Sequence, residues 1–312
     1  MKKRIAVIFL AFIIFIFATV IRAGDYKDTY VRLLKAGKYD ELLKHLTEWE
    51  QVDPDNPELY IAYFSYYYNL SREEKLMLLS PGQIDQIKQK ERVFTLTDPE
   101  DPERVVGYLY SEIVFDEEKM DLGLKYLDEG LKRHPARLDM HLGKLHALDK
   151  ISRYEAGKEA LLEMLNLSVE LDNRWLYQDG VPLEDGYAFM LENIQGWINH
   201  YFNLEEERVH DYIIEICQRM IQLYPDCVYA YNNLGAICYY KNDYPEALAY
   251  FRQAAACNPE DTIVIKNIAH LARTIGDREL ALEYYGKLME YGNEEEKEMA
   301  AEQIKLLEEA NE

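Results

Sequence analysis

The chain has 312 residues, and 35 lysines and arginines against 57 aspartates and glutamates give it a formal net charge of −22 at pH 7. A surface this acidic repels phosphate backbones, so we expect no nucleic-acid partner. A hydrophobic content of 48% excludes a disordered acidic chain, and four cysteines are too few for a disulfide scaffold. Glycine and proline are few while strong helix formers are abundant, which favours helices over strands.

Residues 1–23 have the pattern of an export signal. A positive start at residues 2–4 precedes an uncharged apolar run at residues 5–21, and Ala23 is a small residue at which signal peptidase can cut. The run is almost long enough to span a bilayer, so an uncleaved signal anchor is the alternative. We therefore expect residues 24–312 to be exported to the periplasm or cell envelope, either secreted or anchored to the inner membrane. Membrane contact is expected only if the segment is retained.

Apolar stripes with helical spacing recur along the first half of the mature chain. Residues 23–56 fit a helical hairpin mainly in its second helix. Residues 57–103 begin with a helix, after which the pattern departs from the repeat and an insertion follows. Residues 104–137 and 138–171 carry the small and apolar residues expected of second helices. We predict one helical hairpin in each of these four segments.

The helix at the start of residues 57–103 carries a tyrosine cluster. Tyr60, Tyr63, Tyr66, Tyr67 and Tyr68 point in almost every direction around a helix, so they cannot all be core residues. Tyr60 and Tyr67 belong to the packing stripe. The other three either pack against the insertion or face a ligand, because tyrosine rings suit both peptide and sugar contacts.

The middle of the chain interrupts the helical pattern. Residues 172–193 contain Asp179-Gly180, Pro182 and Gly186, so we predict a loop inserted between hairpins. The next hairpin, residues 194–227, is supported by Trp197 and by a closing proline, although its first helix is divergent.

The hairpin pattern is clearest in residues 228–261. An apolar stripe at spacing i, i+3, i+4 and i+7 is followed by a helix break at residues 242–244 and by a second stripe. Residues 262–295 repeat the plan, with small residues where two helices approach closely. The two stripes in residues 228–261 consist of Tyr231, Leu234, Gly235 and Cys238, and then of Ala247, Phe251 and Ala254.

This 34-residue plan resembles the tetratricopeptide repeat. The resemblance implies an all-α, right-handed α-solenoid of about seven stacked helix-turn-helix hairpins over residues 24–312, with residues 228–261 and 262–295 as the best repeats. It also implies a scaffold of the exported bacterial type whose concave face, lined by first helices, binds a protein or peptide.

The tail reads as a capping helix over residues 296–312. Asn293 and Glu296 have the spacing of an N-terminal capping box. Ala300, Ile304 and Leu307 form one apolar stripe, and the remaining positions are mostly glutamate and lysine, as suits a helix that covers the last hairpin and faces water.

The sequence offers no recognisable catalytic or metal-binding motif. It has no glycine-rich phosphate loop, no nucleophile elbow and no His-Glu-x-x-His motif. The closest histidines, His134, His141 and His146, lack ligand spacing, so we interpret them as surface or interface residues. We therefore predict no catalytic residue, no metal and no cofactor; an enzyme with a site in the loop at residues 172–193 is the least favoured alternative.

The four cysteines all lie between residues 217 and 257. Cys217 and Cys238 occupy core stripe positions, where a thiol acts as a small hydrophobic group. Cys227 and Cys257 lie near ends of helices that antiparallel packing brings together, so a Cys227–Cys257 disulfide is the alternative to four free thiols.

A basic stripe breaks the acidic pattern. Residues 262–276 contain no acid, and Lys266, His270 and Arg273 fall on one helix face. This predicts a seat for a carboxylate or an acidic peptide; the alternative is that the cations balance neighbouring acids. The resemblance adds that family members that clamp an acidic chaperone tail use Lys and Asn on such faces, although no complete clamp set is present. The candidate peptide-binding residues are Tyr229, Asn232, Asn233, Tyr239, Lys266, Asn267, His270 and Arg273.

The sequence thus predicts an exported, non-catalytic scaffold or adaptor that binds a protein or peptide partner on its concave face. The alternative is a glycan- or small-ligand-binding accessory protein that uses the tyrosine-rich face.

Overall fold

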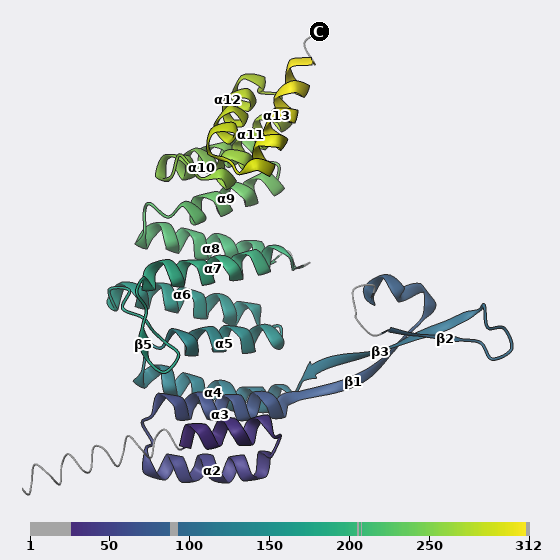
Figure 1. Ribbon diagram of the computed structural model, residues 1–312, viewed down its shortest axis with the longest axis vertical. Helices are drawn as coiled ribbons and strands as arrows, with labels where there is room; N and C mark the ends of the chain where they lie inside the picture. The colour runs from purple at the N-terminus through teal and green to yellow at the C-terminus, as the bar shows by residue number, and fades with distance from the viewer. Residues whose placement is uncertain (1–25, 88–92, 205, 207, 310–312) are drawn as a thin grey trace, which may run out of the picture. The chain divides into compact units, whose positions relative to one another are not determined.

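The computed structural model describes residues 26–87, 93–204, 206 and 208–309 (Figure 1). The predicted export signal, residues 1–23, lies outside these residues. Within them, no helix is long and apolar enough to cross a membrane. The chain divides into two compact units, and we describe each by itself. Unit 1 comprises the described residues up to Arg153 together with Tyr177–Val181, and unit 2 comprises Tyr154–Leu176 and the residues from Pro182 onward.

Unit 1 is a set of antiparallel helices with one β-sheet insertion. A first helix covers residues 26–35. The helices that follow it are α2 (Tyr39–Val52), α3 (Pro57–Ser71), α4 (Glu117–Arg133) and α5 (Leu138–Lys150). Their core includes Leu42, Leu46 and Trp49, whose side chains are fully buried. Gly130 of α4 allows a close approach, because a Cβ there would lie 2.9 Å from Cβ of Tyr60 in α3.

The insertion between α3 and α4 is a β-sheet rather than helix. It contains β1 (Arg72–Leu79), the 3₁₀ helix η1 (Pro81–Ile87), β2 (Val93–Thr97) and β3 (Val105–Phe115). The strands form an antiparallel sheet in the order β1-β3-β2. We call residues 72–87 and 93–116 the arm. Figure 1 shows the arm extending away from α3 and α4.

The arm corrects one predicted hairpin. The sequence pattern predicts a hairpin of its own over residues 104–137, but residues 105–115 are a strand, rich in β-branched and aromatic residues. The predicted segments 57–103 and 104–137 instead supply one helix each to a single hairpin, α3 with α4. The predicted number of hairpins therefore falls by one, while the prediction of helical solenoid repeats is confirmed.

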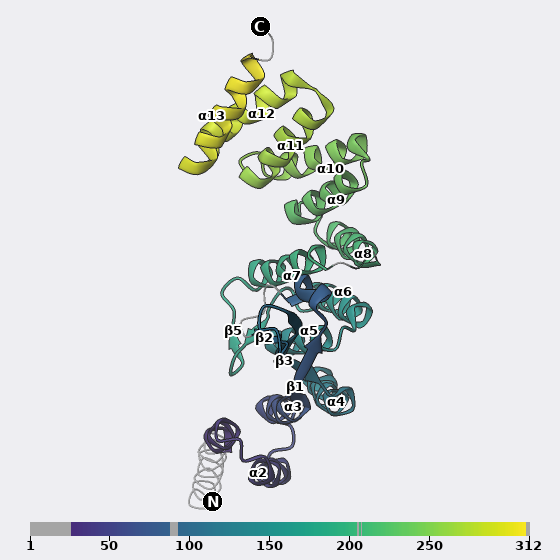
Figure 2. The same ribbon diagram turned by 90° about the vertical axis from the view of Figure 1, so that its right-hand side faces the viewer.

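Unit 2 contains the regular repeats. Its helices are α6 (Tyr154–Glu170), α7 (Gly186–Phe202), α8 (Arg208–Leu223), α9 (Val228–Tyr240), α10 (Tyr244–Cys257), α11 (Thr262–Ile275), α12 (Arg278–Tyr291) and α13 (Glu294–Glu309). Figures 1 and 2 show α9 to α12 as successive antiparallel helices. The small residues act as predicted, since a Cβ on Gly235 of α9 would lie 2.5 Å from the ring of Phe251 in α10.

The loop before α7 is shorter than predicted. The sequence predicts a loop over residues 172–193, but α7 begins at Gly186, and the side chain of Asp185 caps it by accepting a hydrogen bond from the Ala188 amide at 2.9 Å. Gly186 is needed for a close approach, because a Cβ there would lie 2.2 Å from the Asn173 carbonyl oxygen. Two short strands, β4 (Leu176–Tyr177) and β5 (Val181–Pro182), pair within the loop.

A helix is predicted over residues 296–312, and α13 covers Glu294–Glu309; residues 310–312 lie outside the described residues. The Glu296 amide donates to Asn293 Oδ1 and the Asn293 amide donates to Glu296 Oε2, each at 3.0 Å, which is a reciprocal capping box. Ala300 is fully buried against the last hairpin, and Ile304 and Leu307 pack beside it.

Candidate functional site

A groove in unit 2 is lined mainly by the first helices of three successive hairpins, α7, α9 and α11. Its volume is about 530 Å³. The lining is dominated by carboxamide and aromatic side chains, and its full set is Gln195, Asn199, Phe202, Asn203, Val228, Tyr229, Asn232, Asn233, Ala236, Tyr240, Asp261, Ile263 and Val264. None of these described lining residues is a lysine or arginine.

Carboxamides link the three helices along the groove. Gln195 and Asn233 exchange two hydrogen bonds: Asn233 Nδ2 donates to Gln195 Oε1 at 2.8 Å, and Gln195 Nε2 donates to Asn233 Oδ1 at 3.3 Å. Asn267 Nδ2 of α11 donates to Asn232 Oδ1 of α9 at 2.7 Å. Because these bonds hold the amide groups in place, the groove presents them in defined orientations.

Asn232 keeps an unused donor. Its Oδ1 accepts from Asn267, whereas its Nδ2 has no hydrogen-bond partner within the described ranges. The side chain is partly exposed and lies in the groove lining. An amide NH₂ in this position is suited to donate to a peptide carbonyl oxygen.

Exposed apolar side chains border the amide row. Tyr240 is 66% exposed, Ile263 is 55% exposed and Tyr229 is 36% exposed. The ring of Tyr240 lies 6.2 Å from that of Phe202, measured between centroids. Large exposed apolar groups beside ordered polar groups are typical of protein-binding surfaces.

The single acid of the groove is used in the fold. The Asp261 carboxylate accepts hydrogen bonds from the amides of Ile263 and Val264 at 3.0 and 3.1 Å, so it caps the start of α11. Among the described residues that line the groove, Asp261 is the only carboxylate, and none is a lysine or arginine that would pair with a ligand carboxylate.

The predicted peptide-binding residues separate into two groups. Tyr229, Asn232 and Asn233 line the groove, and Asn267 contacts it through Asn232. Asn233 is only 3% exposed, so it positions Gln195 rather than presenting a surface of its own.

The second group contacts the protein's own helices. Lys266 Nζ donates to Glu296 Oε1 of α13 at 2.6 Å, and Arg273 donates to Gln303 of the same helix. His270 Nε2 lies 2.9 Å from the hydroxyl of Tyr239. Lys266 therefore forms an ion pair with an acid of the protein's own capping helix.

The sequence prediction missed the contribution of α7. Gln195, Asn199 and Asn203 follow one another at intervals of four residues on one helix face and line the groove. This spacing is visible in the sequence, but the helix diverges from the repeat pattern, and its start falls in the segment predicted to be a loop.

The four cysteines are free thiols. The alternative disulfide between Cys227 and Cys257 is thus not formed in this structure. Burial raises the pKa of all four thiols, and most strongly for Cys217, which is fully buried. Within the described residues, no group of acids, histidines or cysteines is arranged to hold a metal ion.

The tyrosine cluster is part of the packing of unit 1. Tyr60, Tyr63 and Tyr66 are buried. Tyr63 stacks on Tyr126 with ring centroids 4.2 Å apart, and the Tyr68 hydroxyl lies 3.1 Å from His146 Nε2. These rings are therefore engaged with the helices around them.

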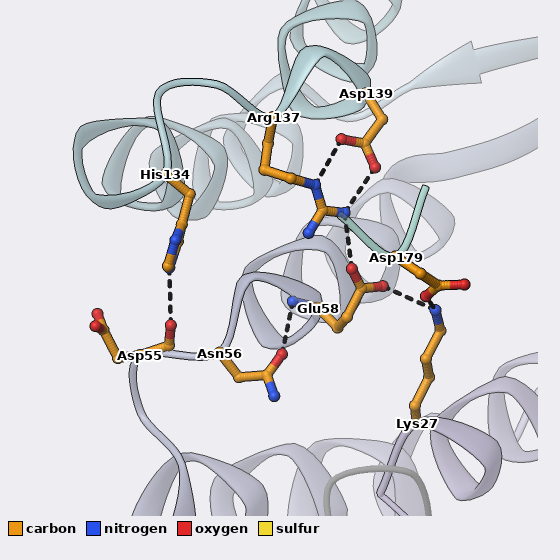
Figure 3. A network of polar contacts seen from close by, with 8 residues as sticks. All are labelled: Lys27, Asp55, Asn56, Glu58, His134, Arg137, Asp139 and Asp179. Carbon is orange, nitrogen blue, oxygen red and sulfur yellow. Dashed lines mark hydrogen bonds and ion pairs between the residues drawn. The ribbon is translucent and has the colours of Figure 1, made fainter. Parts of the chain in front are cut away.

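A buried charge network also lies in unit 1 (Figure 3). Arg137 is 2% exposed and donates to both oxygens of Asp139, at 2.9 and 2.7 Å, and to Glu58 at 2.7 Å. Lys27 joins Glu58 to Asp179, which stands in the loop between β4 and β5. Because each acid in the network faces a cation, the arrangement fixes the loop against the helices of unit 1.

The comparisons with known proteins identify the repeat. The tetratricopeptide repeat family model matches residues 228–261. No functionally curated protein matches the chain.

Similar solved structures have low identity to this chain. PilF of Pseudomonas aeruginosa is 14% identical over 89% of this chain and 96% of its own, with a TM-score of 0.37. The C-terminal part of a TPR repeat-containing protein from Cytophaga hutchinsonii is 15% identical over 91% and 88%, with a TM-score of 0.46. A thermophilic TPR protein of Thermus thermophilus is 18% identical over 60% and 91%, with a TM-score of 0.35. The chain thus contains a tetratricopeptide repeat at residues 228–261, within a series of helical hairpins.

Proposed function

We propose that this protein is an exported, non-catalytic scaffold that binds an extended segment of another protein in the groove of α7, α9 and α11. The observation that carries the proposal is the row of carboxamides held in place by hydrogen bonds between these helices. Carboxamides both donate and accept, so they bind the N–H and C=O groups of an extended backbone whatever its sequence. The mechanism is recognition without turnover.

The groove also defines the chemistry of the bound segment. Its described residues include no lysine or arginine, and its borders are the apolar groups of Tyr229, Tyr240 and Ile263. We therefore propose a segment with apolar anchor side chains in place of the acidic peptide that the basic stripe suggested. Its affinity rests on buried apolar area and backbone hydrogen bonds, so it depends little on salt.

A paired set of variants tests the groove. Tyr240→Ala with Ile263→Ala removes two exposed anchors, and Tyr291→Ala with Ile275→Ala is the control, because Tyr291 and Ile275 are also exposed but lie outside the groove. A photo-crosslinking amino acid is placed at Asn203, and crosslinked partners from envelope extract are identified by mass spectrometry. A synthetic peptide of the crosslinked segment is then titrated against each variant.

We expect the groove variant to raise the Kd of this peptide at least about tenfold, since each apolar anchor contributes more than about 1 kcal/mol. The control pair should leave the Kd unchanged. Raising the salt concentration from about 0.05 to about 0.5 M should change the Kd less than about threefold. A crosslinked peptide that binds the groove variant as tightly as the wild-type chain would contradict the proposal.

A further inference from the structure

One face of the arm is apolar and uncovered. Side chains alternate between the two faces of a strand, so Leu76 and Leu78 of β1 share a face. The strand register places Leu78 opposite Leu109 of β3, and Leu109 opposite Phe94 of β2. On this face Leu76 is 71% exposed, Leu78 is 68% exposed and Phe94 is 64% exposed. We call this set, completed by Leu96, Leu109 and Ile113, the open face. The register also places Glu74 and Ser111 on this side of the sheet, where they hydrogen-bond to each other.

The opposite face of the same sheet is covered. The 3₁₀ helix η1 packs against β3. Tyr110, which belongs to this second face, is buried, and Met77 and Leu79 are each partly buried. Both faces of the arm's sheet thus carry large apolar side chains. Among the described residues, other parts of the chain pack on one of these faces and not on the open face.

Charge is distributed unevenly along the open face. At the base of the arm, Arg72 shares the face of Leu76 by alternation, is exposed, and has no ion-pair partner within the described parts of the chain. At the tip, the turn between β2 and β3 carries Asp98, Glu100, Asp101 and Glu103. Arg104 pairs with Asp98, while Glu100 and Glu103 are exposed without an ion-pair partner among the described residues.

The positive charge at the base and the negative charge at the tip are complementary when one arm is laid antiparallel on another. Arg72 is paired with Phe115, six positions along β3 from Leu109, which is about 20 Å at a strand rise of about 3.3 Å per residue. From Leu109 towards the tip of the arm, β3 continues for four positions to Val105, which is about 13 Å. The acidic turn lies beyond Val105. A two-fold axis near Leu109 therefore brings the Arg72 of each arm over the acidic turn of the other.

The strand at the edge of the open face also favours self-association. The chain carries a net charge of −22, so most of its surface repels a second copy. β1, however, balances Arg72 and Lys75 against Glu73 and Glu74. β1 therefore adds no net charge to a contact between two copies.

We infer that the open face is a dimer interface, in which the arms of two copies of this chain stack face to face and antiparallel as a two-sheet sandwich. Stacked sheets bury the side chains of their inner faces between them, about 10 Å apart. Each copy would place Leu76, Leu78 and Phe94 against the same residues of its partner, and the Arg72–acidic turn contacts would set the antiparallel direction. The interface is isologous and closes at two copies.

Sedimentation equilibrium on the full chain tests the inference. The wild-type chain should have twice its 36.8 kDa mass at micromolar concentration. Leu76→Glu with Phe94→Glu places two charges in the interface and should raise the dimer Kd at least about tenfold. Val181→Glu with Leu306→Glu adds the same charge at two exposed apolar positions that do not belong to the open face and should leave the Kd unchanged.

A charge exchange tests the antiparallel direction. Arg72→Glu alone should weaken the dimer, and the further changes Glu100→Lys and Glu103→Lys in the same chain should restore it, because each arm then carries the reversed pair. Restoration supports antiparallel stacking. If Leu76→Glu/Phe94→Glu disrupts the dimer but the charge exchange does not restore it, the proposed antiparallel direction is wrong.

Two results would overturn the interface itself. One is a wild-type chain that stays monomeric over the whole concentration range, which would assign the open face to a different partner or to a lipid surface. The other is a dimer that Leu76→Glu/Phe94→Glu does not weaken, which would place the contact elsewhere. Neither result bears on the groove, because the peptide titration is carried out separately.

Discussion

At the scale of single residues, Glu296 connects the capping helix to the repeat before it. Its carboxylate accepts from Lys266 Nζ at 2.6 Å, from the Thr262 hydroxyl at 3.2 Å and from the Asn293 amide at 3.0 Å. These bonds lower the pKa of Glu296, and the bond from Lys266 contributes most. Because the folded state prefers the ionised form, Glu296 stabilises the fold above its unfolded pKa, and this contribution disappears as pH falls through the lowered folded pKa.

Substituting this residue should therefore have a pH-dependent effect. Glu296→Gln is expected to lower the free energy of unfolding by about 1 kcal/mol at pH 7, as for loss of a helix cap. The difference from the wild-type chain should shrink towards zero below about pH 4, where the wild-type carboxylate is protonated in the unfolded state and increasingly so in the folded state.

Denaturant unfolding at both pH values measures this difference. Glu302→Gln is a suitable control, since Glu302 lies on the same helix and is exposed without a hydrogen-bond partner among the described residues. An effect of Glu296→Gln that is equal at both pH values would show that ionisation is not its cause.

At the scale of elements, two glycines in unit 2 helices have opposite environments. A Cβ at Gly235 would lie 2.5 Å from a ring carbon of Phe251, whereas a Cβ at Gly286 of α12 would have no neighbour within 4 Å. The first glycine allows α9 and α10 to approach each other. The second occupies an exposed helix position where glycine only costs conformational entropy.

Substitution to alanine should change the free energy of unfolding in opposite directions at the two glycines. Gly235→Ala is expected to destabilise the fold by about 1–3 kcal/mol, because the ring of Phe251 must move within a packed core. Gly286→Ala is expected to stabilise it by about 0.5–1 kcal/mol. Thermal and denaturant unfolding of both variants measures this, and a stabilising Gly235→Ala would contradict the packing of α9 on α10.

At the scale of the whole molecule, the net charge of −22 acts on stability. Like charges distributed over one chain repel each other in the compact state, and salt shortens the reach of that repulsion to about 10 Å at 0.1 M. We expect the melting temperature to rise as sodium chloride increases from about 0.01 to about 0.3 M. Glycerol, which screens no charge, is the control for general solvent effects. A melting temperature that falls steadily with salt would indicate that ion pairs outweigh the repulsion.

The sequence predicted those parts of the fold whose signals are local. The hairpins of residues 228–295 and the Asn293–Glu296 box were predicted, because helix stripes, breaks and caps depend on residues a few positions apart. β1 was missed because its residues, Arg-Glu-Glu-Lys-Leu-Met-Leu-Leu, favour helix individually. It is a strand because it pairs with β3, more than 25 positions away.

In the candidate site, too, local signals were predictable and long-range contacts were not. Tyr229, Asn232 and Asn233 were assigned to the groove from the spacing within one helix. The roles of Lys266 and Arg273 depend on α13, which contacts them from about 30 positions along the chain. Spacing within α11 identified their common face, but the sequence pattern could not identify which helix would cover it.

The insertion of the arm between α3 and α4 has a consequence for the order of folding. Hairpins of unit 2 close over short turns, such as the three residues between α9 and α10, whereas α3 and α4 must find each other across residues 72–116. Closing the longer loop costs roughly 2 kcal/mol more of chain entropy. The ends of the arm lie together, since the Asp116 amide donates to the Ser71 carbonyl oxygen at 2.8 Å. We therefore expect pairing of β1 with β3 to accompany α3–α4 docking, and the C-terminal repeats, whose contacts are more local, to form earlier.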